Sequence, residues 1–195
     1  MGKAWAKAHE LHVAAGLVVI GSIAMAASVH RAAPDGLYPD LRMFLTGLVA
    51  AGVSVALQGR DTVREQASAR VVWYLHVTAV LVSGLVPAAT LLVCMTVWPG
   101  QFAVPSTVPL VWAVLFAAGL TALAAHVVRA RTAAGITVLA LAAVFISRYV
   151  MSGPTGARLA LIHPESPPEI AWTVSVTVFV LGLAAVRMGK RTAIA

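Results

Sequence analysis

The sequence predicts an all-α membrane protein with six transmembrane helices and both termini in the cytoplasm. Of its 195 residues, 60% are hydrophobic and 11% are charged, and the mean hydropathy is +0.89. A soluble domain is nearer half apolar and a quarter charged, so this composition fits the lipid bilayer as its solvent. The apolar runs show no alternation of polar and apolar residues, which favours helices over transmembrane strands.

The first two spans are read from apolar runs near the N-terminus. A transmembrane helix needs about 20 mostly apolar residues, and residues 11–29 contain no Asp, Glu, Lys or Arg. Lys3 and Lys7 precede this run, which is also the pattern of a signal peptide, but the run is longer than a typical signal core. A second, shorter span is expected over 43–59.

The other spans follow from one long apolar stretch and two shorter ones. Residues 71–128 carry no formal charge, and they are too many for a single helix. Pro99, Pro105 and Pro109 are expected to interrupt them. Further spans are therefore predicted over 71–97, 108–128, 132–151 and 170–186, which makes residues 1–195 a single transmembrane domain.

The distribution of basic residues orients the chain. Six spans place the N-terminus, the even-numbered loops and the C-terminus on one side, which holds 10 of the 14 Lys and Arg residues. The remaining 4 are Arg31, Arg42, Arg148 and Arg158. Because cytoplasmic loops carry the excess of Lys and Arg, both termini are expected in the cytoplasm.

The loop between the second and third spans is charged and helix-like. Asp61, Arg64 and Glu65 give mixed charge at helical spacing. Thr62 stands three residues before Glu65, which is a capping-box pattern for a helix start. A short helix at the membrane surface is expected here. It could dock a cytoplasmic partner, or it could be a solvated connector.

The extracellular segment 152–169 mixes turn residues with an apolar run. Leu159 to Ile162 is apolar, and Pro164, Pro167 and Pro168 favour extended backbone. The apolar part could dip into the membrane, where non-helical backbone must be covered by protein or line a cavity. A surface loop packed on the bundle is the alternative.

Three histidines are predicted near the cytoplasmic ends of spans. They are His12, His76 and His126, and the last two are the best matched in depth. Neutral imidazole can ligate haem or a metal. A histidine near the headgroups is more often an amphipathic interfacial residue. No metal site is predicted, because no His-x-x-x-His or His-x-x-Glu spacing occurs.

Other chemistry receives no support from the residue pattern. All 7 acidic residues fall in predicted loops or tails, whereas ion-coupled transporters usually need buried carboxylates. No nucleophile motif and no complete phosphate-binding Gly-rich loop occurs. The chain is therefore not expected to be an enzyme by itself. The basic residues form no stripe with interleaved aromatics, so no nucleic-acid partner is expected.

Several local patterns carry a resemblance to a known family. They are the string Asp61 to Arg70, followed by Trp73 to His76, then Pro164, Trp172 at the start of the last span, Gly182, and the basic end Arg187 to Arg191. Together with the layout of spans and loops, they resemble the membrane subunit of ABC-2-type exporters, in the small form of high-GC bacteria. The resemblance covers the whole chain by layout and a few residues by motif.

The resemblance implies a permease subunit in the bacterial plasma membrane. It would pair with a second permease subunit, as homodimer or heterodimer, and with an ABC ATPase subunit that binds ATP and Mg²⁺. No cofactor would be bound directly. The cargo would be amphipathic, lipid-like or a peptide, moving along spans one, two and five. The implied coupling residues are Arg60, Asp61, Arg64, Glu65, Arg70, Arg129 and Arg131, and an implied extracellular re-entrant segment holds Leu159, Leu161, Ile162 and Pro164.

Two other functions remain open at this point. One is a haem-binding or quinone-linked membrane anchor that uses His76 and His126. The other is a non-catalytic membrane scaffold or regulatory subunit, in which small residues such as Gly47, Ala51 and Ser54 serve only to pair helices.

Overall fold

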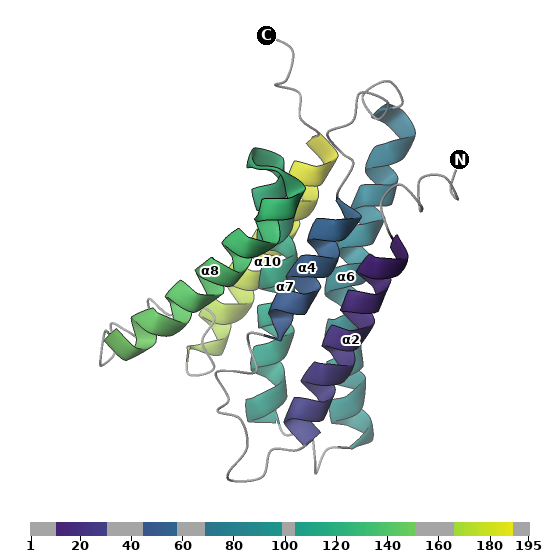
Figure 1. Ribbon diagram of the computed structural model, residues 1–195. Coiled ribbons are helices and arrows are strands. Elements are labelled where there is room, and N and C mark those ends of the chain that lie inside the picture. The colour runs from purple at the N-terminus through teal and green to yellow at the C-terminus, as the bar shows by residue number, and fades with distance from the viewer. Residues whose placement is uncertain (1–10, 31–44, 58–68, 99–103, 151–165, 189–195) are drawn as a thin grey trace.

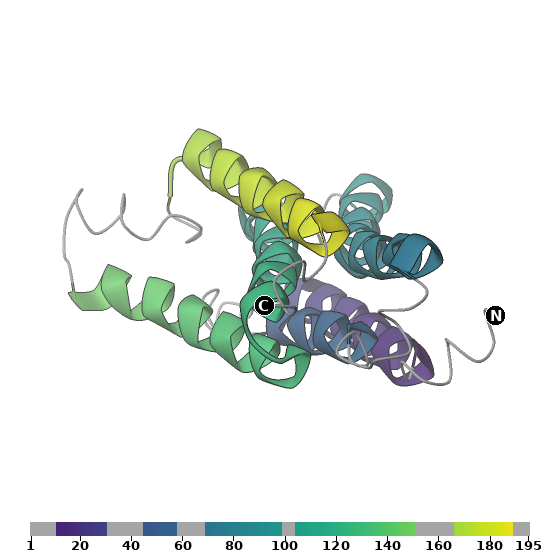
Figure 2. The same cartoon turned by 90° about the horizontal axis from the view of Figure 1, so that it is seen from above.

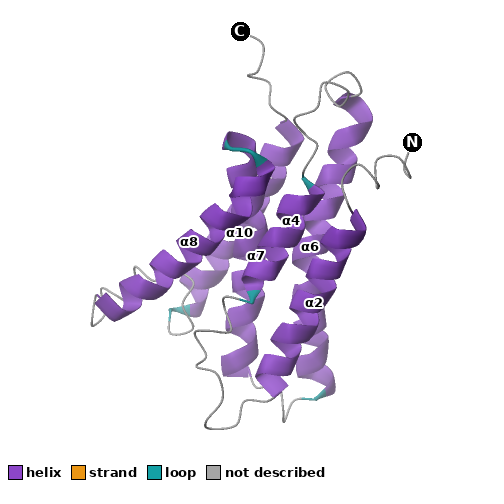
Figure 3. Ribbon diagram, in the orientation of Figure 1, coloured by secondary structure: helices purple, strands orange, loops and turns teal. Residues whose placement is uncertain are grey.

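The computed structural model describes residues 11–30, 45–57, 69–98, 104–150 and 166–188, and all regular structure in these ranges is helical (Figure 3). The six helices of these ranges are α2 (Leu11–His30), α4 (Thr46–Ala56), α6 (Ala69–Val97), α7 (Val104–Val127), α8 (Ala130–Val150) and α10 (Pro168–Met188). They confirm the predicted all-α class, and each falls on one of the six predicted spans.

Four of these helices are long and apolar enough to cross a membrane. Their apolar parts are Leu11–Val29, Tyr74–Val97, Thr107–Val127 and Pro168–Met188, of 19, 24, 21 and 21 residues. The apolar parts of α4 (Thr46–Ala56) and α8 (Thr132–Val144) are shorter. The helices are thus those of a membrane protein, while six full spans and their orientation stay predictions.

Helix α7 begins earlier than predicted, at Val104 rather than near residue 108. The sequence predicts that Pro99, Pro105 and Pro109 interrupt the helical stretch. The first four N–H groups of a helix have no partner within it, so Pro105 fits the first turn without losing a bond. Pro109 lies inside the helix and removes only one intrahelical hydrogen bond.

Helix α10 also begins two residues before the predicted start. The Pro167 carbonyl accepts the N–H groups of Ile170 at 3.0 Å and of Ala171 at 3.1 Å, and Pro168 is the first helical residue. Proline is well suited to that position because its fixed φ is already helical. Glu169, predicted in a loop, lies in the first turn, where the positive end of the helix dipole favours a carboxylate.

Helix α7 is the centre of the bundle. It packs against α10, α6, α4 and α8, and the view from above shows it between them (Figure 2). In its apolar window 78% of residues are buried, against 33% in each of the other three long windows. Its residues are apolar on every side, which fits a helix that other helices cover all round.

The helices alternate in direction. In Figure 1, α2, α6 and α8 run downward, whereas α4, α7 and α10 run upward. The ends of α4 and α7 and the starts of α6 and α8 therefore gather at the top, which is called the α7–α8 end below. The start of α2 and the end of α10 lie at this end too (Figure 1).

Helix α8 leaves the bundle as it proceeds. It packs on α7 and α4 near its start, and it then leans away from the other helices (Figures 1 and 2). Leu139 is 70% exposed and Ile146 57% exposed. Apolar side chains of this size are at home in lipid, so this face is consistent with a bilayer around the bundle.

Candidate functional site

A hydrogen bond joins the end of α4 to the start of α8 at the α7–α8 end. The Ser54 hydroxyl in the last turns of α4 donates to the backbone carbonyl of Ala130, the first residue of α8. Ser54 is 4% exposed and Ala130 9% exposed, so the bond is shielded. It holds the end of α4 beside the turn that joins α7 to α8.

That turn is short and internally bonded. The carbonyl of Arg129 accepts the N–H of Thr132 at 3.0 Å and its hydroxyl at 2.8 Å. The N–H of Val128 donates to Ala124 at 2.8 Å, which closes the last turn of α7. Arg129 itself is exposed. The turn therefore presents a cationic side chain from a fixed backbone.

Parts of the predicted coupling surface lie at one end of the bundle. Arg129 lies in the α7–α8 turn, Arg131 in the first turn of α8, and Arg70 in the first turn of α6, all at the α7–α8 end (Figure 1). The α8 helix thus starts inside the predicted loop, and the connector is shorter than expected. Arg60, Asp61, Arg64 and Glu65 lie outside the described residues.

The predicted re-entrant segment is also outside the described residues. This holds for Leu159, Leu161, Ile162 and Pro164. The helices on either side are described: α8 ends at Val150 and α10 begins at Pro168. Both points lie at the end of the bundle opposite the α7–α8 end (Figure 1).

The two candidate ligand histidines lie at the same level of the bundle. A Cβ built on Gly84 of α6 would be 3.4 Å from the Cβ of Ala118 in α7, and the two helices run in opposite directions (Figure 1). His76 is eight residues before Gly84, and His126 is eight residues after Ala118. At 1.5 Å per residue, each is about 12 Å from that contact, toward the α7–α8 end.

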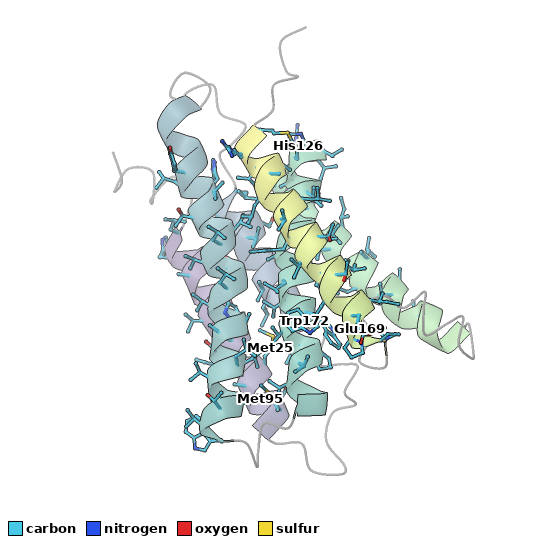
Figure 4. The ribbon with its side chains drawn as sticks, turned by 180° about the vertical axis from the view of Figure 1, so that it is seen from behind. Met25, Met95, His126, Glu169 and Trp172 are labelled. Atoms are coloured by element: carbon cyan, nitrogen blue, oxygen red, sulfur yellow. The ribbon has the colours of Figure 1, made fainter. Side chains whose placement is uncertain are left out.

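The environments of the histidines differ. His76 is 2% exposed, which makes it a core residue rather than the interfacial residue that the pattern suggested as its ordinary role. His12 is exposed. His126 is half-buried near the end of α10, far from Trp172 at the start of that helix (Figure 4), and its Nδ1 atom is buried without a hydrogen-bond partner among the described residues. In those same ranges, no three His, Cys, Asp or Glu side chains cluster as metal ligands would.

A close backbone approach joins α7 and α10. A Cβ on Gly182 would lie 2.5 Å from the carbonyl oxygen of Gly119, and a Cβ on Gly119 would lie 2.5 Å from the Cα of Phe179. No side chain fits at either position without moving a backbone. Membrane helices associate through close contact between small residues, because in lipid there is no hydrophobic driving force between their apolar side chains.

The side chain of Phe179 extends this contact to a third helix. A Cβ on Gly84 in α6 would lie 2.7 Å and 3.1 Å from two ring carbons of Phe179. About two turns earlier in α10, Trp172 packs edge-on against Trp112 of α7, with ring centroids 6.2 Å apart (Figure 4). Aromatic side chains of α10 therefore pack it against both α6 and α7.

Buried hydroxyl groups link α7 to α8. The Thr121 and Thr137 hydroxyl oxygens are 2.9 Å apart, and each also lies near a carbonyl of its own helix, Ala117 at 2.7 Å and Ala133 at 3.2 Å. The two hydroxyls hold two protons for these three contacts. One arrangement runs from Thr137 through Thr121 to Ala117, and the other runs in the opposite direction.

Two other buried hydroxyls have no such partner. Thr107 at the start of α7 and Ser175 on the buried face of α10 are both fully buried. Their hydroxyl oxygens make no hydrogen bond in the described part of the chain. A buried hydroxyl left without a partner costs free energy, so each is a test point for the energetics of the bundle.

Comparisons of the chain with protein-family models, with curated proteins and with solved structures gave no match. The function of the chain is therefore inferred from the geometry of the α7–α8 end and from the residue patterns.

Sequence reasoning found some of these contacts and missed others. Gly47 and Ser54 were expected at helix contacts, and both face α8: a Cβ on Gly47 would be 3.3 Å from Val138. Gly84 and Gly119 were missed, because isolated glycines in apolar runs carry no pairing signal until the helices are placed. The only sequence signal for such a contact would have been a small residue three or four positions from a large one, on the same face of a helix.

Proposed function

We propose that this chain is the membrane subunit of an ATP-driven ABC-2-type exporter. The observation that carries the proposal is the hydrogen bond from Ser54 to Ala130. Ser54 lies near the end of α4, the helix that precedes the predicted coupling residues, and Ala130 directly follows Arg129 of the α7–α8 turn. A single cytoplasmic partner could therefore touch both connectors at once.

The packing of the bundle supports transmission of motion from such a contact. The α7–α8 turn leads directly into α7, the most buried helix, whose tight contact with α10 at Gly119 leaves no space for independent movement. A push on this turn would move α7 and α10 together. Interiors packed in this way transmit strain rather than absorb it.

The exposed faces favour an amphipathic cargo. By resemblance, the path is lined by α2, α4 and α8, and in the bundle α4 packs on both of the others. Exposed residues of α2 include Ile20 at 59% and Ile23 at 63%. Such walls would accept a lipid-like or peptide cargo. In this proposal the protein lies in the plasma membrane with both termini cytoplasmic, pairs with a second permease subunit, and leaves ATP and Mg²⁺ to the ATPase.

Charge reversal in the α7–α8 turn tests the proposed docking. Arg129→Glu should greatly reduce the amount of ATPase that co-purifies with the tagged protein from its own host. Arg187→Glu is the matched control, because Arg187 is exposed in the last turn of α10 at the same end but outside the predicted coupling segments. Equal losses for both variants, or no loss for either, would contradict specific docking at the turn.

The other connector allows a second, functional test. Reversing the charge of Asp61, Arg64 or Glu65 should abolish ATP-driven transport in vesicles while the protein still folds. The thermal unfolding temperature of each variant checks the fold. Unchanged transport would rule out this connector as the coupling element.

The equal level of His76 and His126 favours one alternative function, a haem-binding membrane anchor. In that case the protein purified with added haem shows a Soret band, which disappears in a His76→Ala, His126→Ala double variant. The exporter proposal predicts no such band.

A further inference from the structure

Helix α6 contains a proline in its interior. Pro87 is buried inside the 29 residues of Ala69–Val97. Because proline has no N–H group, it cannot donate the hydrogen bond to the carbonyl of Ser83, and its ring crowds that carbonyl. Proline in a helix interior costs about 3 kcal/mol relative to alanine. The backbone hydrogen bonding of α6 is therefore interrupted between Ser83 and Pro87.

Gly84 removes the side chain that would otherwise support the same turn. The space that its Cβ would occupy is taken by the Phe179 ring of α10, at 2.7 Å and 3.1 Å. A large, rigid side chain from a neighbouring helix thus bears on α6 at the turn where the helix has lost a hydrogen bond. Sharp helix bends occur at prolines and where a side chain reaches into the ladder.

Phe179 is itself held in a fixed position. Its Cα and N atoms lie against Gly119 of α7, with 2.5 Å and 2.6 Å to a Cβ built there, and Gly182 contacts Gly119 from the next turn. The α7–α10 pair has no room to slide at this point. The ring is therefore a fixed support against which α6 can turn.

The half of α6 before this turn is only partly covered by other helices. Figure 1 shows the start of α6 projecting beyond the ends of α2 and α4 at the α7–α8 end. Tyr74 and Val82 in this half are 59% and 50% exposed, whereas His76 and Val80 are buried. A helix end that extends past its neighbours moves at a lower cost than one packed on all sides.

We propose that α6 is a hinged helix, which bends between Ser83 and Pro87 about the Phe179 ring. Its first half, residues 69–82, swings relative to the fixed α7–α10 pair. The inference goes beyond the exporter proposal and needs no partner protein. From Pro87 to Tyr74 the lever is about 20 Å long, so a bend of about 20° moves position 74 by about 7 Å.

Distances between spin labels in lipid nanodiscs test the hinge. The parent protein carries Cys94→Ala, and labels are placed by Tyr74→Cys and Met188→Cys, at residues that are 59% and 61% exposed. A reference pair, Val127→Cys and Met188→Cys, spans the fixed α7–α10 contact. The distance distribution of the first pair should be at least about twice as wide as that of the reference pair.

Substitution of the proline separates a hinge from general flexibility. Pro87→Ala restores a donor to the Ser83 carbonyl and adds the strongest helix former, so the Tyr74 distribution should narrow to the reference width. Pro109→Ala in α7 is the matched control and should leave it wide. A parent distribution no wider than the reference, or equal effects of the two alanine variants, would overturn the hinge.

Discussion

Gly182 of α10 rests directly on the backbone of Gly119 in α7, where a Cβ at position 182 would lie 2.5 Å from the Gly119 carbonyl oxygen. This contact explains how the central helix and the last helix behave as one unit. It places Phe179 where its ring reaches α6. The pair is the fixed part of the bundle, and both the coupling proposal and the hinge depend on it.

Enlarging Gly119 should therefore destabilise the protein. In Gly119→Ala the new methyl group would overlap the backbone of Phe179, and overpacking of this kind costs about 1–3 kcal/mol. The free energy of unfolding by SDS in mixed micelles measures the effect. Gly16→Ala and Gly135→Ala are matched controls, because nothing lies within 4 Å of a Cβ at either position. They should be neutral or gain up to about 1 kcal/mol, since alanine favours the helix. Equal effects at all three sites would contradict the close contact.

The hydroxyls of Thr121 and Thr137 should be energetically coupled. Each Thr→Val substitution removes one hydroxyl at almost constant shape. A double-mutant cycle on the free energy of unfolding should give a coupling of about 0.6 kcal/mol, and at most about 1.7 kcal/mol. Thr90 and Thr96, whose hydroxyls bond only to carbonyls of their own helix α6, form the control cycle, with a coupling near zero. A zero value for the first pair would mean that the 2.9 Å contact contributes nothing.

Ser175→Ala should stabilise the protein or leave it unchanged. The buried hydroxyl makes no hydrogen bond within the described residues, and an unsatisfied buried donor costs about 1–3 kcal/mol. Removing it relieves that cost while the small side chain still fits the α7–α10 contact. Chemical unfolding of the variant gives the sign. A loss above about 1 kcal/mol would show that Ser175 has a bound water or other partner.

Ser54→Ala should loosen the α7–α8 end. It removes the hydroxyl that joins α4 to the first residue of α8, with an expected cost of about 1 kcal/mol. It should also raise the hydrogen exchange of amides 130–133. Ser28→Ala is the control, because the Ser28 hydroxyl bonds only to Met25 in its own helix. If both variants exchange alike, the link between the two connectors has no energetic role.

The apolar runs predicted the helices well. The prolines caused the starts of two helices to be predicted wrongly. Every described helix coincides with a predicted span, because long apolar runs have no other stable form in lipid. The prediction placed the starts of α7 and α10 too late, by treating Pro105 and Pro168 as breaks. In both cases the proline lies in the first turn, where its missing N–H has no consequence.

The contacts between helices were less predictable. His76 was read as an interfacial residue, yet it is 2% exposed, because its burial depends on which face of α6 meets the bundle. The roles of Gly119 and Phe179 also depend on which helix faces meet, so the sequence did not indicate them. An apolar helix in lipid has no polar face to fix its rotation, so the sequence alone does not reveal which residues face inward.

Native mass spectrometry of the tagged protein, extracted gently from its own host, tests the central proposal most directly. The account predicts an assembly in which this chain and an ATPase subunit occur in equal number, and its loss in the Arg129→Glu variant but not in Arg187→Glu. The chain alone, or with a bound haem, in the parent protein would contradict the exporter proposal.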